Sequence, residues 1–361
     1  MNSRNAVEQF QRMSHTQNVL LTTRAATAIY LSLKTFSGSG KIVIPSTICL
    51  SPIVAAMEAG YEIKFVGVKD FQVDLTTTAN LINSDPSINA VLLPELYGYP
   101  LQGLKEFWNK IAHRNLLLIE DLAQTLGESR LSELSGKPTV VSVYSFGRSK
   151  VVESIRCGMI ATKDKSFFSE LESNYNALPF DLPTEYQKNL DTYNLLYAKL
   201  LSSPYQNRNW AKFYKAAMGI DRTLYTPKIQ QTIVPEGIEL FPKSLTEERN
   251  SRHHWVSDQL AEFDFIKQPE NIEPMGPVWR TTILVPAMVR DEIVEKIRSH
   301  QQPASTWYKA MHRLVGGANG DSDYSLKEAV QFEAGVINLF LDVEEFDSYV
   351  QLLVSVMREY N

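Results

Sequence analysis

The first two-thirds of the chain alternates short apolar runs with segments that repeat apolar residues at helical spacing. The runs 42–45 and 90–94 are apolar without alternation, which is typical of strands buried on both faces. Segments 26–36, 51–60 and 102–114 carry apolar residues three or four positions apart and predict helices. This order predicts an α/β fold around a large, mainly parallel sheet with helices on both faces.

The pattern changes after Lys165. Residues 165–225 are rich in Tyr, Asn and Leu at helical spacing and predict two or three helices. The Pro residues and short β runs of 227–244 predict a linker, and the tail then alternates strand and helix. We therefore expect a large α/β domain over 1–235 and a small α+β domain over 236–361.

Composition narrows the range of partners. The chain has 361 residues and a net charge of −5, which argues against nucleic acid or an anionic membrane as the main partner. Cys49 and Cys157 form no CxxC spacing, so the sequence predicts neither a disulfide framework nor a metal site. The polar start and the absence of a long apolar run predict a cytoplasmic protein.

Three places in the first half carry candidate chemistry. Asp121 ends a predicted strand, at the edge where a parallel sheet places its site. Lys150 follows the β-type run that ends near Ser145, and the small residues of the turn 22–27 open a helix where a phosphate can approach backbone N–H groups. Singly, these patterns fit a helix cap, a solvated lysine and an ordinary turn equally well. Together they suit pyridoxal 5'-phosphate (PLP), which needs a lysine, a carboxylate and phosphate donors.

The two charged residues have definable tasks at such a site. Opposite charges about 4 Å apart, at an effective dielectric constant of about 20, attract by about 4 kcal/mol. A carboxylate can therefore raise the pKa of a pyridine nitrogen by up to roughly three units and keep it protonated. An ordinary lysine, with a pKa of about 10.4, is protonated at neutral pH, so a reactive lysine needs an environment that lowers its pKa.

Two linked segments resemble a known family. IEDLAQTLGES with VYSFGRSK resembles the paired signature of the DegT/StrS family of PLP-dependent aminotransferases of nucleotide-linked keto-sugars. Segments 24–33, 42–68, 92–107, 157–162 and 336–342 resemble other parts of that family in the same order. The resemblance implies the aspartate-aminotransferase fold (fold type I) and a homodimer with sites at the subunit interface.

The resemblance also implies roles for single residues. Lys150 would bond covalently to the cofactor and carry protons, and Asp121 would hold the pyridine nitrogen. A lysine at position 150 also argues against the family's sugar dehydratases, which carry histidine there. The reaction implied is amino transfer from an amino acid, by family habit glutamate, to a keto-sugar. The implied cofactor-binding set is Ala25, Ala26, Asp121, Gln124, Ser145 and Lys150.

The chain departs from the family pattern at several points. Ile48-Cys49 stands where the family carries a ring-stacking aromatic residue, and Arg24 stands in a phosphate turn that usually reads Ser-Gly-Thr. The family segment whose Asn reaches the neighbouring subunit has no clear counterpart between residues 174 and 243. His312 lies in a segment with only a loose resemblance, where a core histidine and a substrate contact are both open readings.

Two other functions stay open at this point. One is amino transfer to a keto substrate that is not a sugar, in a natural-product or amino-acid pathway. The other is a binding or regulatory module that keeps the fold without turnover.

Overall fold

A seven-stranded sheet forms the centre of the first two-thirds of the chain. The computed structural model describes residues 3–131, 134–147, 149–153, 157–180, 183–203, 207–224, 243–270, 272–316 and 324–361. The strands lie in the order β1-β9-β8-β7-β6-β2-β3, and only β9 runs against the others. Their bounds are β1 Val19–Thr22, β2 Gly40–Pro45, β3 Tyr61–Val66, β6 Ile88–Pro94, β7 Leu117–Asp121, β8 Thr139–Ser145 and β9 Gly158–Ala161.

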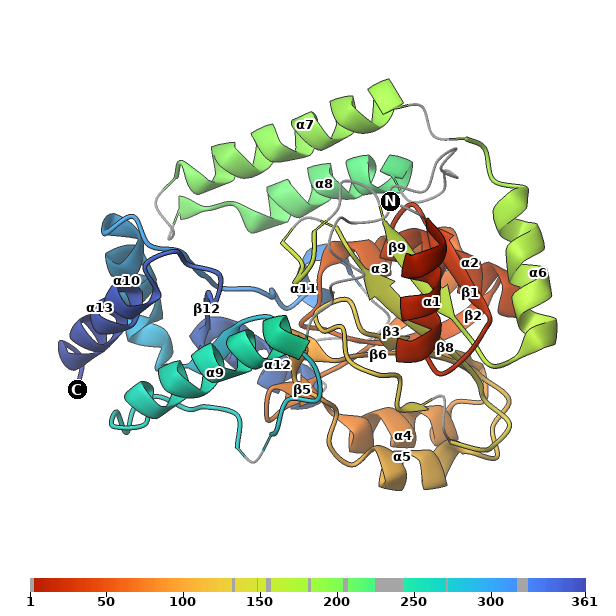
Figure 1. Cartoon of the computed structure of the whole chain (residues 1–361), viewed down its shortest axis with the longest axis horizontal. Helices are drawn as coiled ribbons and strands as arrows, with labels where there is room; N and C mark the ends of the chain where they lie inside the picture. The colour runs from red at the N-terminus through yellow and green to blue at the C-terminus, as the bar shows by residue number, and fades with distance from the viewer. Residues whose placement is uncertain are drawn as a thin grey trace.

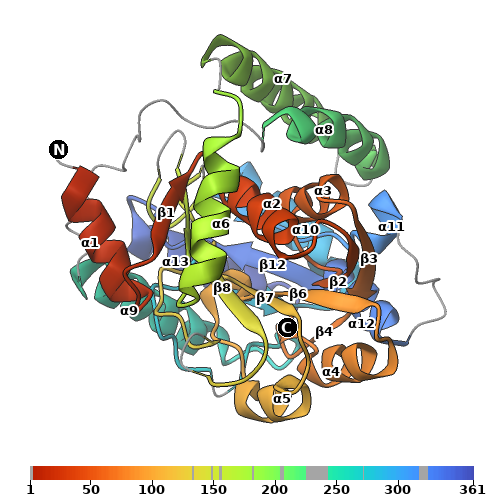
Figure 2. The same cartoon turned by 90° about the vertical axis from the view of Figure 1, so that its right-hand side faces the viewer.

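Helices cover both faces of this sheet, as Figure 2 shows. One face carries α2 Ala25–Phe36, α3 Leu50–Glu58 and α6 Lys165–Asn176; the other carries α4 Leu75–Ser84 and α5 Leu104–Ile111. The central strands β6 and β7 are buried along nearly their whole length, which explains their unalternated apolar runs. The predicted α/β fold class with a mainly parallel sheet is confirmed.

A second, three-stranded sheet lies in the last third of the chain. Its order is β10-β12-β11, and all its pairs are antiparallel. Its elements and the helices around it are α9 Lys243–Leu260, β10 Thr281–Leu284, α10 Ala287–Ser299, β11 Ala304–Ser305, α11 His312–Val315, α12 Tyr324–Gly335, β12 Val336–Leu339 and α13 Phe346–Arg358. The predicted domain boundary at 235/236 lies outside the described residues, so the division stays a prediction.

Two long helices follow α6 and form a hairpin. They are α7 Pro183–Leu201 and α8 Trp210–Leu224, and together with α6 they make the three helices described in the segment for which the pattern predicts two or three. Figure 1 shows α7 and α8 side by side above the sheet. Phe213, Tyr214 and Ala217 of α8 join the apolar core that contains α2 and α3, so the hairpin is anchored to the central sheet.

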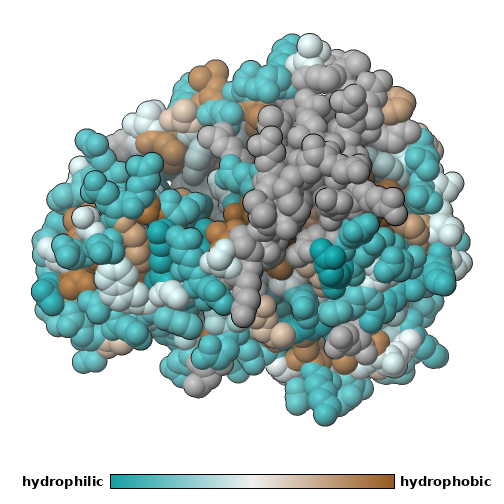
Figure 3. All heavy atoms as spheres, in the orientation of Figure 1, coloured by the Kyte–Doolittle hydropathy of each residue, from teal (hydrophilic) through white to brown (hydrophobic). Residues whose placement is uncertain are grey.

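Four further elements were not predicted from the sequence. They are α1 Ser3–Met13, the two-residue strands β4 Val68–Lys69 and β5 Gln72–Val73, and the 3-10 turn η1 Leu96–Gly98. Within the described segments, no helix has both the length and the apolar character needed to span a membrane. Polar residues cover most of the face drawn in Figure 3, and apolar ones form small groups.

Candidate functional site

The predicted lysine and aspartate meet at the carboxyl edge of the large sheet. Asp121 is the last residue of β7, and Lys150 lies in the loop that follows the adjacent parallel strand β8. Asp121 is buried, and its Oδ1 accepts the N–H of Ala123 over 3.0 Å. Ser149 has a left-handed φ of 63°, an uncommon value for a residue other than glycine, and directly precedes Lys150. Neighbouring parallel strands thus place an acid and an amine at the same edge.

The two charges influence each other. Burial raises the pKa of Asp121, while the positive charge of Lys150 and the N–H of Ala123 lower it. Burial lowers the pKa of Lys150, against the opposite effects of Cys49 and Asp121, and the charges of Arg280 and Arg24 lower it further. A lysine with a lowered pKa has a larger neutral fraction at physiological pH, as a nucleophile and proton carrier requires.

The N-terminus of α2 lies beside this pair and fits a phosphate. No side chain within the described residues caps this end, so its first-turn N–H groups are available. A Cβ on Gly158 would lie 2.3 Å from the carbonyl carbon of Arg24 and 2.4 Å from the nitrogen of Ala25. The hydroxyl of Thr27, in the same turn, is buried and has no hydrogen-bond partner among the described residues. The absent side chain of Gly158 therefore lets β9 approach the turn at Ala25 and Ala26.

The other predicted cofactor residues, Ser145 and Gln124, lie at the same edge. Ser145 ends β8, and its hydroxyl accepts the N–H of Gly147 over 3.4 Å. The Gln124 side chain is buried; its oxygen accepts the N–H of Tyr97 and its nitrogen donates to the hydroxyl of Tyr308. Gln124 therefore joins the loop after β7 to segments from both sheets.

Aromatic rings continue from Gln124 towards the lysine loop. Trp279 stacks on Tyr308 with ring centroids 6.4 Å apart and planes 6° apart, and Tyr97 stacks on both. The indole Nε1 of Trp279 donates to the carbonyl of Ser149 over 2.6 Å. The segment that precedes β10 thus contacts the residue next to Lys150 directly.

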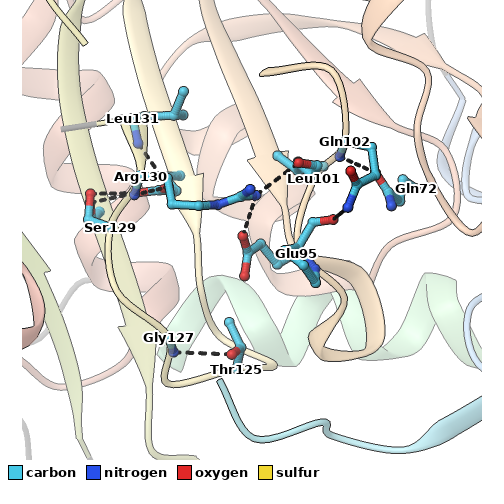
Figure 4. Close-up of polar contacts among 12 residues, drawn as sticks. Gln72, Glu95, Leu101, Gln102, Thr125, Gly127, Ser129, Arg130 and Leu131 are labelled. Carbon is cyan, nitrogen blue, oxygen red and sulfur yellow. Dashed lines mark hydrogen bonds and ion pairs between the residues drawn. The ribbon is translucent and has the colours of Figure 1, made fainter. Parts of the chain in front are cut away.

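Figure 4 shows the contact between Arg130 and the buried Glu95, which form an ion pair. Arg130 donates to Glu95 over 2.9 Å and to the carbonyl of Leu101 over 3.0 Å. Glu95 follows β6, and Arg130 follows the loop of Gln124, so the pair ties the two loops together. Burial outweighs the attraction of Arg130 and raises the pKa of Glu95 to about 7.

The residues that depart from the family pattern also lie near this site. The Arg24 guanidinium donates to Asp221 of α8 over 2.8 Å and to the hydroxyl of Ser51 over 3.3 Å. Burial raises the pKa of the Cys49 thiol to about 11, so this residue stays a neutral thiol near Lys150. His312 is buried and its Nδ1 lies 2.6 Å from the hydroxyl of Ser46, which matches the core-histidine reading.

Sequence reasoning missed four residues that the fold brings to this edge. Glu95 and Tyr97 follow a buried strand, and that position was a usable signal because ligands gather at strand carboxyl ends. Asp221 lies in α8 and Trp279 lies just before β10, both far along the chain and with no local signal. Their places depend on tertiary packing.

The sequence also matches the model of a known protein family. The model of the DegT/DnrJ/EryC1/StrS aminotransferase family matches residues 3–354, which is nearly the whole chain.

Individual relatives are distant. GDP-perosamine synthase of Escherichia coli O157:H7 is 23% identical over 164 residues, 44% of this chain and 44% of that protein. UDP-4-amino-4,6-dideoxy-N-acetyl-beta-L-altrosamine transaminase of Campylobacter jejuni is 24% identical over 151 residues, 41% of this chain and 40% of that protein. The chain therefore aligns with less than half the length of either relative.

Solved structures extend the similarity to the whole fold. NtdA from Bacillus subtilis, with bound cofactor PMP, superposes with a TM-score of 0.67 at 17% identity, over 98% of this chain and 77% of NtdA. This confirms the fold type predicted from the sequence. With the family model matching residues 3–354, the chain belongs to the DegT/DnrJ/EryC1/StrS aminotransferase family.

Proposed function

We propose that the chain is a PLP-dependent aminotransferase that moves an amino group from an amino-acid donor to a keto-sugar linked to a nucleotide. The observation that carries the proposal is the meeting of Lys150 and Asp121 beside the uncapped N-terminus of α2. Family membership supports the reaction class, and the names of two relatives, both nucleotide-sugar enzymes, support the acceptor.

Each residue has a task in this proposal. When bound, PLP supplies the electron sink of amino transfer. Lys150 would hold the cofactor covalently, and its lowered pKa would let its Nζ accept and return a proton during amino transfer. Asp121 stabilises the positive charge of the pyridine nitrogen. The first turn of α2, at Ala25 and Ala26, binds the phosphate together with Ser145.

Loading of the site is tested by reduction. Borohydride treatment of the PLP-incubated protein, followed by peptide mass mapping, is expected to give a pyridoxyl adduct on Lys150. An adduct on another lysine would refute the assigned role. No adduct at all would favour a module that keeps the fold without turnover.

The acceptor is tested separately. The α7 and α8 hairpin brings aromatic rings together: the rings of Tyr193 and Tyr197 each lie 5.7 Å from that of Phe213, centroid to centroid. The hairpin lies in the segment where the family's cross-subunit Asn has no clear counterpart, and this difference supports a second candidate, amino transfer to a keto substrate without a nucleotide sugar. A panel of nucleotide-linked keto-sugars and small keto acids separates the two, because activity on small keto acids alone would exclude the sugar assignment.

The proposal extends to the whole protein. It places the site between a domain of residues 1–235 and a domain of residues 236–361, in a cytoplasmic homodimer. The aromatic contacts of Trp279 with Tyr97 and Tyr308 support the placement between domains. Sedimentation equilibrium of the loaded protein tests the dimer, and a monomer at working concentration would count against it.

A further inference from the structure

A buried stretch of backbone, residues 276–279, passes beside the site without joining either sheet. It lies just before β10 and is buried along its whole length. A Cβ on Gly276 would lie 2.8 Å from the backbone nitrogen of Gly127, and a Cβ on Gly98 would lie 2.7 Å from that of Trp279. The 276–279 segment is therefore in close contact with the loops that follow β6 and β7.

Two side chains of α9 bind the backbone of this segment. The Asn250 oxygen accepts the N–H of Val278 over 3.0 Å, and its nitrogen donates to the carbonyl of Gly276 over 3.2 Å. Arg249 donates its Nε to the carbonyl of Val278 over 2.8 Å and a second N–H to that of Trp279. Buried backbone groups outside a sheet need such partners, so α9 fixes the path of the segment.

The far end of the segment holds the peptide group before Lys150. The Ser149 carbonyl accepts the indole N–H of Trp279 over 2.6 Å, and the N–H of the same peptide group donates to the Gly147 carbonyl over 3.3 Å. Ser149 has its left-handed φ of 63°, which is unfavourable for a residue with a side chain and persists where the surroundings hold it. The indole therefore helps to set the direction in which the Lys150 side chain leaves the backbone.

The proposed reaction makes this direction important. The Lys150 Nζ has to meet the cofactor and exchange a proton at one defined place. An error of about 1 Å in the placement of a reacting group can lower a rate by about a hundredfold. Because Lys150 lies on a loop after β8 and not within the strand, support from outside the loop improves its placement.

We propose that Asn250 is a positioning residue for Lys150, an inference that rests on the proposed function. Its amide fixes the 276–279 segment, the segment fixes the Trp279 indole, and the indole fixes the peptide group between Ser149 and Lys150. Asn250 acts through Trp279 and is not itself a catalytic residue.

The test follows Lys150 in variants of this chain of contacts. The proteins are wild type, Asn250→Ala, Asn250→Asp, Trp279→Phe and both double variants that combine a change at position 250 with Trp279→Phe. Mass spectrometry measures amide hydrogen exchange in the peptide that contains Lys150, on protein without cofactor. The rate at which Lys150 captures PLP is measured by stopping the reaction with borohydride at set times and quantifying the pyridoxyl adduct.

Gln268→Ala is the matched control. The Gln268 side-chain amide also binds a backbone carbonyl, that of Ser257 in α9, over 2.9 Å. Its loss removes a hydrogen bond of the same kind from the same helix without changing the partners of the 276–279 segment. Both readouts on Lys150 should therefore match wild type, whatever the change in Tm.

The proposal predicts an effect that disappears without the indole. We expect Asn250→Ala to speed exchange in the Lys150 peptide about fivefold, as loss of one hydrogen bond allows, and to slow PLP capture about tenfold. Asn250→Asp, which keeps the acceptor for Val278, should show smaller effects. In the Trp279→Phe background, either change at position 250 should alter both readouts by less than about twofold, because residues that act in series are not additive.

Other outcomes would overturn it. Unchanged exchange and capture in Asn250→Ala exclude the positioning role, and so do effects that add in full to those of Trp279→Phe. If Asn250→Ala does not fold, Asn250→Asp decides, alone and with Trp279→Phe. A wild-type protein that forms no Lys150 adduct refutes the proposed function itself, whereas a loaded wild type with unaffected Asn250 variants refutes only this inference.

Discussion

At the scale of single residues, the site depends on what burial does to charge. The same low-dielectric edge raises the pKa of Asp121 and lowers that of Lys150, and each residue partly offsets the shift of the other. Neither group would behave in this way on an exposed loop. Their reactivity is therefore a property of position at the edge of the sheet.

Removing either member of the pair is expected to stop or slow amino transfer. Lys150→Ala should abolish it, because no other described amine is placed to bond the cofactor. Asp121→Ala should lower the rate by about a thousandfold, equivalent to about 4 kcal/mol of transition-state stabilisation. Single-turnover rates measure both effects. The control Asp191→Ala, in α7, should leave the rate unchanged, and a near-normal rate in Asp121→Ala would contradict its role.

The buried Glu95 makes stability depend on pH. Its pKa is raised to about 7 in the folded protein, whereas an unfolded glutamate has a pKa of about 4.3. Between these values the folded state holds a proton that the unfolded state has lost, so the free energy of unfolding falls as pH rises.

Glu95→Gln removes this titration. Relative to the variant, wild type should lose about 3 kcal/mol of unfolding free energy between pH of about 4.5 and 7, and little beyond. Urea unfolding at a series of pH values measures the difference. Glu106→Gln, an exposed change in α5, is the control. Parallel curves for wild type and Glu95→Gln would show that Glu95 does not titrate in this range.

At the scale of elements, the proposed phosphate site depends on how closely β9 approaches α2. The turn at Arg24 and Ala25 touches the backbone of β9 only because residue 158 has no side chain. Clashes with backbone atoms cannot be relieved by moving a side chain, so a Cβ at this position must push the two elements apart.

Gly158→Ala is expected to lower both stability and cofactor affinity. Overpacking of this kind costs about 1–3 kcal/mol, and the displaced turn should bind phosphate more weakly. Chemical unfolding and PLP titration measure the two effects. Gly219→Ala in α8 is the matched control: a Cβ there meets no atom within 4 Å, and helical Ala is about 1 kcal/mol more favourable than Gly. Equal PLP affinity in the two variants would contradict the role given to Gly158.

At the scale of the whole molecule, the site joins the two sheets. The N–H of Trp279 donates to the carbonyl of Tyr97 over 3.0 Å, while its indole reaches Ser149 over 2.6 Å. The segment before β10 is therefore bonded to a loop after β6 and to a loop after β8. Because a ligand stabilises the state that binds it, PLP should strengthen the whole arrangement.

Trp279→Phe should weaken this coupling. An aromatic ring remains at position 279, but the Ser149 carbonyl loses its hydrogen-bond donor. This loss costs about 1 kcal/mol. The rise in Tm on adding PLP is expected to be smaller than in wild type. Trp108→Phe is the control. Trp108 lies in α5, on the face of the sheet away from α2, and its indole donates to the carbonyl of Ser135 over 3.0 Å. An unchanged PLP response in Trp279→Phe would contradict the coupling.

Local patterns in the sequence were sufficient to predict the α/β architecture around the large sheet. The runs that became β6 and β7, and the helical spacing of α2, α3 and α5, report burial and periodicity directly, because each strand or helix must bury its own apolar face. They also placed Asp121 at the end of one strand and Lys150 just past another. The strands β4 and β5 were not predicted, since pairing over two residues leaves no periodic signal. Helix α1 was also not predicted, because its low apolar content hid the helical spacing of its few apolar residues.

Tertiary packing decided which distant residues complete the site. Asp221 beside Arg24 and Trp279 against Ser149 are contacts across more than 100 positions, and no local spacing encodes them. The ring of Phe340, which lies over the Arg280 guanidinium, likewise comes from a separate element of the small sheet. The sequence by itself determined the sheet, its carboxyl edge and the acid and amine on it, because these follow from strand order and periodicity. Only the folded chain decided their pKa values and the buried cation beside them, because desolvation depends on what packs around a group from everywhere else.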